Sequence, residues 1–237
     1  QSLAVYLLLC TIGSLLASGA FAESAAALGA NQPQKGERYY SIALELSLAA
    51  SIVICGLGFL LSEPIAIALG SPDSWEMVKT YIQITFLGGV FKIFLYIPFF
   101  YLRLEGKTSQ SACAMLVMTI LNIVLDYLFL FVFDWGIGGA AWASVLATAV
   151  ACGISFFYMA TSKDGFHFHL VRPRPAEIVK IITNGSPMAA NNLCSALRIV
   201  LLNGVMNLVG GSSMVAAFAV TNSLNEFSIC IQNGVPQ

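Results

Sequence analysis

Residues 111–160 read SACAMLVMTILNIVLDYLFLFVFDWGIGGAAWASVLATAVACGISFFYMA, and they decide the fold of this chain. The stretch consists of two apolar runs, 111–133 and 137–160, that are joined by the short turn sequence DWGIGG at 134–139. An apolar run of about 20 residues is long enough to cross the hydrocarbon core of a bilayer as a helix. We therefore expect two membrane-spanning helices connected by a tight turn.

The same pattern extends over the rest of the sequence. Further apolar stretches of spanning length cover residues 1–22, 42–69, 80–102, 181–209 and 214–236, which makes seven stretches in all. The second of these has room for a span of about 20 residues. We expect that span to be followed by a short re-entrant or interfacial piece around Glu63 and Pro64.

The composition supports this class of protein. Hydrophobic residues make up 58% of the 237 residues, charged residues make up 10%, and the mean hydropathy is +0.82. A soluble domain carries about 25% charged residues, so we predict an all-α polytopic membrane protein. The net charge of −1 argues against nucleic-acid partners. The six cysteines lie apart in apolar stretches without CxxC or Cys/His spacing, which argues against a disulfide framework or a metal site.

The positive charges are sorted between the connections. Eight of the eleven Lys and Arg residues fall within residues 31–40, 103–110 and 161–180, whereas the intervening connections carry only Lys79. Cytoplasmic loops of membrane proteins carry such an excess of Lys and Arg. We therefore expect these three loops to face the cytoplasm. The third is the longest polar stretch, and it predicts a boundary between two bundles of helices.

Asn122 and Asp126 are the first candidates for chemistry. They stand four residues apart in an otherwise apolar run, so they share one helix face. A carboxylate and an amide oxygen on adjacent turns can bind a monovalent cation or hold a proton, and ionisable groups within a span normally face a cavity or a partner. A structural hydrogen bond between helices is an equally good interpretation of the pair.

Polar residues also mark other spans. Lys92 lies about ten residues from either end of its stretch, too deep for its ammonium to reach water easily, and it is a candidate counter-charge to Asp126. Tyr81, near the outer end, is expected in an aromatic belt. The polar residues of the 181–209 stretch gather on one helix face, which predicts a wet cavity. The predicted substrate cavity comprises Lys92, Asn191, Asn192, Ser195, Arg198, Asn203 and Glu226.

Arg198 has two interpretations that stay open at this point. Its guanidinium lines the predicted cavity, or it pairs with Glu226 of the next span and locks the bundle. The two are compatible, because an ion pair at mid-depth can also border a cavity.

Five motifs occur in order along the chain. They are ALGANQPQKGE (27–37), RLEGKTS (103–109), LNIVLDYLFLFVFDWGIGGAAWASVLAT (121–148), NGSPMAANNL (184–193) and LLNGVMNLVGGSSMVAAFAV (201–220). Together they resemble motifs of the multidrug and toxic compound extrusion (MATE) family, including its N-x-x-L-D … G-x-x-G-A-A-x-A-T pattern. The resemblance covers nearly the whole chain.

This resemblance implies a two-lobe helical bundle with pseudo-symmetric repeats that exchanges its substrate by alternating access. Residues 1–162 would form the first lobe without its first helix, residues 163–180 the cytoplasmic inter-lobe loop, and residues 181–237 the truncated start of the second lobe. Because the sequence lacks an initiator Met and stops within an apparent span, we expect a fragment with about seven of twelve helices.

The resemblance also implies roles for individual residues. Asn122 and Asp126 would belong to a cation or proton site of the first lobe, and Ser144 would join it from the position of a family threonine. The implied function is an antiporter, coupled to H⁺ or Na⁺ and without other cofactors, that exports small amphipathic organic compounds or drugs. We expect a multi-pass monomer in a bacterial inner membrane, with the small-molecule substrate and membrane lipid as its partners.

Two alternatives remain. A lipid-linked oligosaccharide flippase of the same superfamily would have a more cationic cavity, to which Lys92 and Arg198 would contribute. A membrane-embedded enzyme would need a nucleophile with its base, a metal triad or paired carboxylates at mid-depth, and we find none of these in the sequence. We therefore predict a transporter and not an enzyme.

Overall fold

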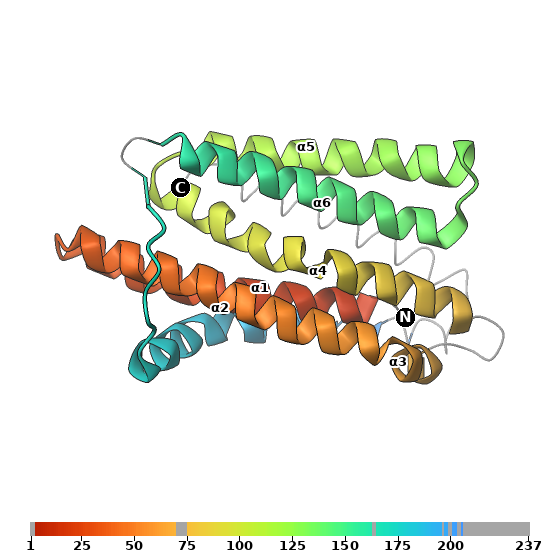
Figure 1. Cartoon of the computed structure of the whole chain (residues 1–237), viewed down its shortest axis with the longest axis horizontal. Helices are drawn as coiled ribbons and strands as arrows, with labels where there is room; N and C mark the ends of the chain where they lie inside the picture. Colours follow the sequence, from red (N-terminus) through yellow and green to blue (C-terminus); the bar gives the residue numbers. More distant parts are fainter. Residues whose placement is uncertain are drawn as a thin grey trace. The chain divides into compact units, whose positions relative to one another are not determined.

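A computed structural model describes residues 3–69, 75–162, 165–195, 197–198, 201–202 and 205 (Figure 1). Over this part of the chain every regular element is a helix, as predicted. The elements are α1 (Leu3–Gly29), α2 (Pro33–Leu60), α3 (Ser62–Leu69), α4 (Trp75–Leu104), α5 (Thr108–Tyr127), the π-helix η1 (Leu128–Val132) and α6 (Gly136–Ala160). Residues 175–195 are also helical.

Five of these helices are long and apolar enough to cross a membrane: α1, α2, α4, α5 together with η1, and α6. They correspond to the first five predicted spans. The short piece predicted after the second span is the separate helix α3. α2 begins at Pro33, so its first turns include charged residues of the first predicted loop. The predicted spans 181–209 and 214–236 lie partly or wholly outside the described residues.

Short turns connect the helices because suitable residues stand at their ends. Asn31 adopts a φ of 58° between α1 and α2, Asp134 adopts 53° just before α6, and Gly136 adopts 57° as the first residue of α6. Asn, Asp and Gly tolerate this left-handed region better than other residues do. Pro33 is the first residue of α2, where its missing N–H costs no helical hydrogen bond.

The end of α5 differs from the sequence-based expectation of a plain helix to residue 133. The N–H of Phe133 donates to the carbonyl of Leu128 (2.9 Å), which is the wider π spacing. The Phe129 ring stacks on Trp135 with centroids 4.8 Å apart, and Gly139 leaves room for both side chains. Packing of these rings on the start of α6 accounts for the wider turn, and hydrophobic periodicity does not reveal it.

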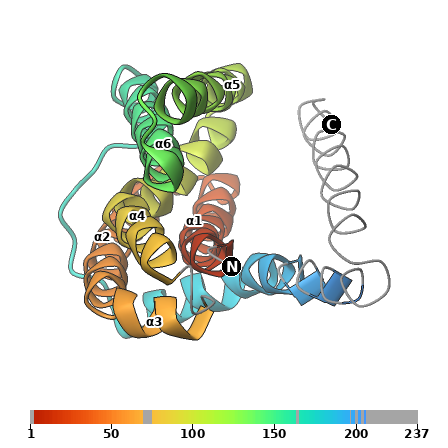
Figure 2. The same cartoon turned by 90° about the vertical axis from the view of Figure 1, so that its right-hand side faces the viewer.

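α4 is the central helix of the bundle. It packs against α1 and α2 on one side and against α6 on the other, while α5 packs on α6 (Figure 2). The largest buried cluster lies between α1, α2 and α4, where the hydroxyls of Tyr101 and Ser24 are 2.8 Å apart. Large side chains such as Ile52 and Ile120 are exposed at the periphery, as expected for helices that face lipid.

Two glycines bring the helical residues 175–190 close to α1. A Cβ atom at Gly19 would overlap the backbone oxygen of Ile181, and a Cβ at Gly185 would overlap the backbone oxygen of Leu15. Glycine therefore lets the two backbones approach more closely than any other residue would, as small residues do between membrane helices.

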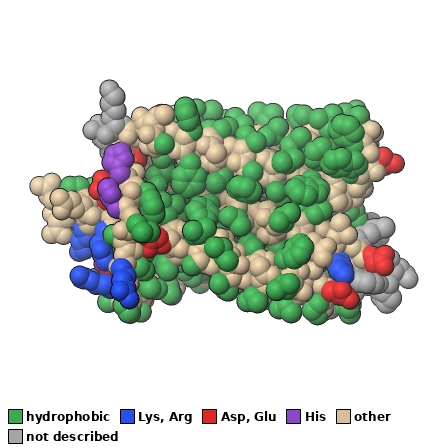
Figure 3. Space-filling view, in the orientation of Figure 1, with side chains coloured by type: hydrophobic (Ala, Val, Ile, Leu, Met, Phe, Trp, Pro, Cys, Tyr) green, Lys and Arg blue, Asp and Glu red, His purple; other side chains and the backbone are tan. Residues whose placement is uncertain are grey.

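The three loops rich in Lys and Arg meet at one end of the bundle. Figure 3 shows Lys and Arg side chains gathered at this end, next to the apolar surface. The backbone N–H of Phe166 donates to Glu105 (3.2 Å), and Arg38 donates to Glu177 (2.7 Å), so hydrogen bonds join all three loops. This is the arrangement that the charge pattern predicts for loops on a common side. The helix after the third loop begins at residue 175 rather than 181.

The chain divides into two compact units, residues 1–190 and 191–237. The first contains α1 to α6 and most of the helix that begins at residue 175. The predicted lobes, with a loop at 163–180 between them, concern a longer two-lobe protein and stay a prediction.

Candidate functional site

The hairpin of α5 and α6 brings two of the predicted site residues together. The side-chain nitrogen Nδ2 of Asn122 on α5 donates to Oγ of Ser144 on α6 (3.3 Å). Thr148, one turn further along α6, donates from Oγ1 to the backbone carbonyl of Ser144 (2.7 Å). The structural hydrogen bond between helices is therefore present, and it places an amide beside a hydroxyl.

Asp126 follows Asn122 by one turn of α5 and stands just before η1. Its Oδ1 atom is buried and accepts no hydrogen bond within the described part of the chain. A buried carboxylate oxygen without a donor is costly, so such atoms are rare in folded proteins. The arrangement leaves an acceptor that a proton or a cation would satisfy, one turn from the Asn122–Ser144 contact.

A small cavity of about 30 Å³ lies beside Ser144, between α1, α4 and α6. This is roughly the volume that one water molecule takes up in the liquid. Six of the ten residues that line it carry a polar group, five of them a hydroxyl and one an ammonium, and the other four are apolar. Its polar residues are Tyr6, Tyr81, Thr85, Lys92, Ser144 and Thr148.

Lys92 is held by Tyr6 on α1. Its Nζ donates to the Tyr6 hydroxyl (2.6 Å) and lies 4.3 Å from the centre of that ring, which provides hydrogen-bond and cation–π stabilisation. Among the described residues no direct ion pair joins Lys92 to Asp126, and the longer-range role of Lys92 as a counter-charge stays a prediction. The two are not directly paired because Lys92 reaches from α4 toward α1, whereas Asp126 stands on α5, which packs chiefly on α6.

Tyr81 is a site residue that the sequence analysis placed in the outer aromatic belt. In the structure it is half-buried and lines the cavity together with Tyr6 and Lys92. A signal was present in the sequence, because Tyr81, Thr85 and Lys92 follow the spacing of one helix face. Tyr6 had no comparable signal, since a lone tyrosine in an apolar span is compatible with many positions.

The remaining predicted cavity residues lie in the second unit: Asn191, Asn192, Ser195, Arg198, Asn203 and Glu226. Asn192 and Ser195 are half-buried, and the other two described members of this set are exposed. Asn203 and Glu226 lie outside the described residues. The pairing of Arg198 with Glu226, and the cavity role of the whole set, therefore stay predictions.

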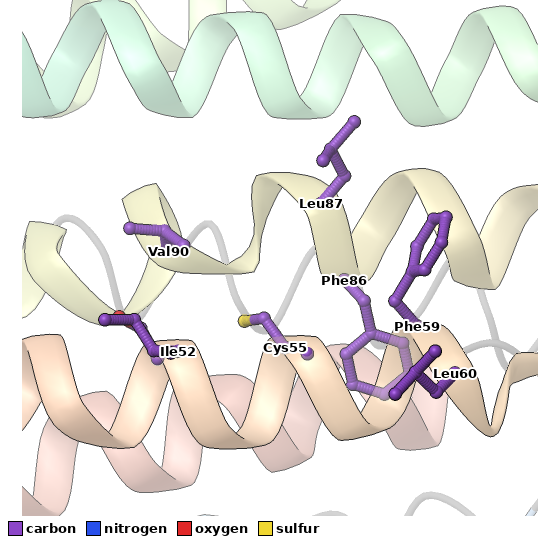
Figure 4. Close-up of a pocket in the computed structure, with 9 residues that line it drawn as sticks. Ile52, Cys55, Phe59, Leu60, Phe86, Leu87 and Val90 are labelled. Atoms are coloured by element: carbon purple, nitrogen blue, oxygen red, sulfur yellow. The ribbon is translucent and has the colours of Figure 1, made fainter.

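A larger hollow of about 440 Å³ lies between α2 and α4 (Figure 4). Apolar side chains such as Phe86 and Val90 surround it, and no charged residue lines it. Ile52 and Leu60 at its edge are exposed, so the hollow belongs to the apolar periphery of the bundle and not to the polar site. Within the described residues, no three metal-ligating side chains gather into a cluster.

The sequence of this chain is similar to those of known proteins. The sequence matches the family model MatE over residues 2–128, which is more than half of the chain. The chain belongs to the MatE family. This MatE chain is 25% identical, over 99% of its length, to the multidrug export protein MepA of Staphylococcus saprophyticus. It spans about half the length of that relative, 52%.

The fold of this MatE chain is also that of solved transporter structures. It matches an outward-facing conformation of a multidrug resistance MATE family transporter with a TM-score of 0.84, covering 98% of this chain and 52% of that one. It matches an inward-facing conformation with a TM-score of 0.79, covering 90% of this chain and 50% of that one. The sequence identity is 22% in both cases. Membership of this family confirms the predicted multi-pass helical membrane protein and rules out the membrane-embedded enzyme.

Proposed function

We propose that the protein containing this chain is an ion-coupled exporter of small amphipathic organic compounds, in which Asp126 binds the coupling ion, H⁺ or Na⁺. The observation that carries the proposal is the buried Oδ1 of Asp126, one turn from the contact between Asn122 and Ser144. A proton would neutralise the carboxylate, and a sodium ion would bind it together with neighbouring side-chain oxygens. The name of the relative, a multidrug export protein, supports the substrate class.

Coupling requires that the ion bind one conformation of the protein more tightly than another. Asp126 stands where α5 passes into the π-helix η1, and π turns within helices are frequent at functional sites. Neutralising Asp126 removes the cost of burying a carboxylate, so ion binding favours the conformation in which this side chain is shielded. Release of the ion favours the conformation in which the side chain reaches water.

The test is uptake of a fluorescent cationic dye into inverted vesicles that contain the full-length protein. A pH gradient and a sodium gradient are imposed separately. We expect one gradient to drive uptake, Asp126→Asn to abolish it, and Asp134→Asn to retain it. Asp134 is a matched control because it lies in the exposed turn of the same hairpin. Undiminished uptake in Asp126→Asn under both gradients would remove Asp126 from the coupling site.

A second candidate, the lipid-linked oligosaccharide flippase, is favoured by Lys92. Its ammonium is held at mid-span by Tyr6, and an interior cation suits a substrate that carries phosphate. Movement of a fluorescent lipid-linked sugar without dye uptake would support this candidate. Loss of that movement in Lys92→Met would connect it to the interior cation.

A further inference from the structure

The segment 165–174, which connects α6 to the helix beginning at residue 175, is fixed along α2. The backbone N–H of His169 donates to Oγ of Ser41 (3.0 Å), and the backbone N–H of Val171 donates to Oε1 of Glu45 (2.8 Å). Both acceptors are side chains of α2, four residues apart and therefore on one helix face. Two successive hydrogen bonds hold the segment parallel to the surface of α2.

Phe166 and Val171 form the inner side of this segment. The Phe166 ring lies 4.9 Å from the Tyr101 ring and 5.8 Å from the Tyr40 ring, in the largest buried cluster. Its backbone N–H donates to Glu105 (3.2 Å). Val171 packs against the same cluster. The segment is therefore part of the folded bundle and has a defined inner and outer side.

The outer side combines apolar and basic side chains. Leu170 is 86% exposed and Phe168 is 52% exposed, while Arg172 and Arg174 are both exposed beside them. A leucine and a phenylalanine that face outward together, next to two arginines, have the composition of a segment at a membrane surface. Figure 3 shows Lys and Arg side chains at this end, where the apolar surface stops.

The length of α2 sets the depth of the segment. α2 has 28 residues, which at about 1.5 Å per residue exceeds the roughly 30 Å hydrocarbon core by about 12 Å. Glu45 is the last charged residue of α2, and only uncharged residues follow it to Leu60. The hydrogen bonds from His169 to Ser41 and from Val171 to Glu45 therefore hold the segment beside the polar end of α2, where its uncharged stretch begins.

The carboxylates near this end already have partners. Glu177 accepts two hydrogen bonds from Arg38, and Glu105 pairs with Lys107 (2.9 Å). Within the described part of the chain no ion pair includes the guanidinium of Arg172 or Arg174. Arg174 lies close enough to Glu177 to help lower the pKa of that carboxyl, but it forms no direct ion pair with it. The guanidinium donors of both arginines therefore remain for a partner outside the bundle, and guanidinium matches phosphate oxygens with two parallel hydrogen bonds.

We propose that the outer side of the 165–174 segment binds the anionic phospholipid headgroups of the cytoplasmic leaflet. Arg172 and Arg174 bind the phosphates, and Phe168 and Leu170 insert at the boundary between headgroups and acyl chains. The negative surface potential of that leaflet favours basic residues near it. Because the segment is hydrogen-bonded to α2, bound lipid would fix the bundle's depth in the membrane at this point.

The first test measures depth without changing any charge. Leu170→Trp is introduced into the full-length protein, which is placed in nanodiscs of phosphatidylcholine with phosphatidylglycerol. The emission spectrum of the added tryptophan is obtained by subtracting the spectrum of the parent protein. We expect blue-shifted emission that brominated acyl chains quench. Gln34→Trp, in the exposed first turn of α2, should emit as in water. Water-like, unquenched emission at position 170 would overturn the proposal.

The second test measures charge selectivity. The amount of phosphatidylglycerol that remains bound is compared with phosphatidylcholine by native mass spectrometry. Replacing Arg172 and Arg174 with Gln should reduce the preference for the anionic lipid by roughly fivefold per charge. Replacing Lys35 and Lys180 with Gln removes the same charge from exposed positions at the same end, and should have a smaller effect. Equal losses in the two double variants would overturn the assignment to this segment.

Discussion

The side-chain amide of Asn122 donates to the hydroxyl of Ser144 at 3.3 Å, across two helices and 22 residues of sequence. This contact sets how α5 faces α6 one turn before Asp126. The site therefore depends on an oxygen at position 144 as well as on the carboxylate. It also explains why a serine can stand where the family resemblance suggests a threonine, since both side chains supply a hydroxyl.

Ser144→Ala should weaken binding of the coupling ion, whereas Ser144→Thr should preserve it. Loss of one hydrogen bond is worth about 0.5–1.5 kcal/mol, which corresponds to roughly a two- to tenfold rise in the ion concentration at half-maximal transport. The measurement is dye transport as a function of ion concentration for the two variants. Identical curves for Ser144→Ala and the parent protein would show that the hydroxyl takes no part.

Tyr6 and Lys92 should prove energetically coupled. The hydroxyl of Tyr6 accepts a hydrogen bond from the ammonium at 2.6 Å, and its ring provides a second contact. A double-mutant cycle with Tyr6→Phe and Lys92→Met should give a coupling free energy of about 1–2 kcal/mol in thermal unfolding. Additive effects of the two substitutions would mean that the contact contributes nothing to stability.

Gly19→Ala and Gly185→Ala should each destabilise the protein by about 1–3 kcal/mol, because a Cβ at either position overlaps backbone of the facing helix. Gly153→Ala is the matched control. Gly153 lies in α6, and a Cβ atom added there would meet no atom of a neighbouring element within 4 Å, so alanine should be neutral or stabilising. Thermal unfolding of the three variants in detergent measures the difference, and equal midpoints would contradict the close helix contact.

The ion pair of Arg38 with Glu177 should make stability depend on pH. The two hydrogen bonds from Arg38 hold the pKa of the Glu177 carboxyl below its usual value of 4.5. The contribution of the ion pair to stability is therefore complete above the usual carboxyl pKa of 4.5 and is lost as the pH falls through the lowered pKa of Glu177. The midpoint difference between the parent protein and Glu177→Gln should be constant from about pH 6 to 8 and should shrink below about pH 4. A difference independent of pH would contradict the ion pair.

The sequence predicted the helical spans because long apolar runs have no other stable form in a bilayer. It also predicted the common end of the basic loops, since the sorting of Lys and Arg is visible without a structure. The spacing of Asn122 and Asp126 located one helix face of the candidate site. Contact with Ser144 followed only from the family resemblance.

Other features depend on packing between distant residues, which periodicity does not encode. The partner of Lys92 is Tyr6, 86 residues away, and nothing in either local sequence specifies that pair. The π-helix after Asp126 arises from rings that pack against the next helix. The inner and outer sides of the 165–174 segment depend likewise on acceptors from α2.

The central claim is that Asp126 binds the coupling ion, and direct ion binding tests it most simply. The binding of protons and the binding of ²²Na⁺ are measured separately on the purified full-length protein, on Asp126→Asn and on Asp134→Asn. At neutral pH we predict that the parent protein and Asp134→Asn bind one more equivalent of H⁺ or of Na⁺ than Asp126→Asn does. Ion binding in Asp126→Asn equal to that of the parent protein would contradict the claim.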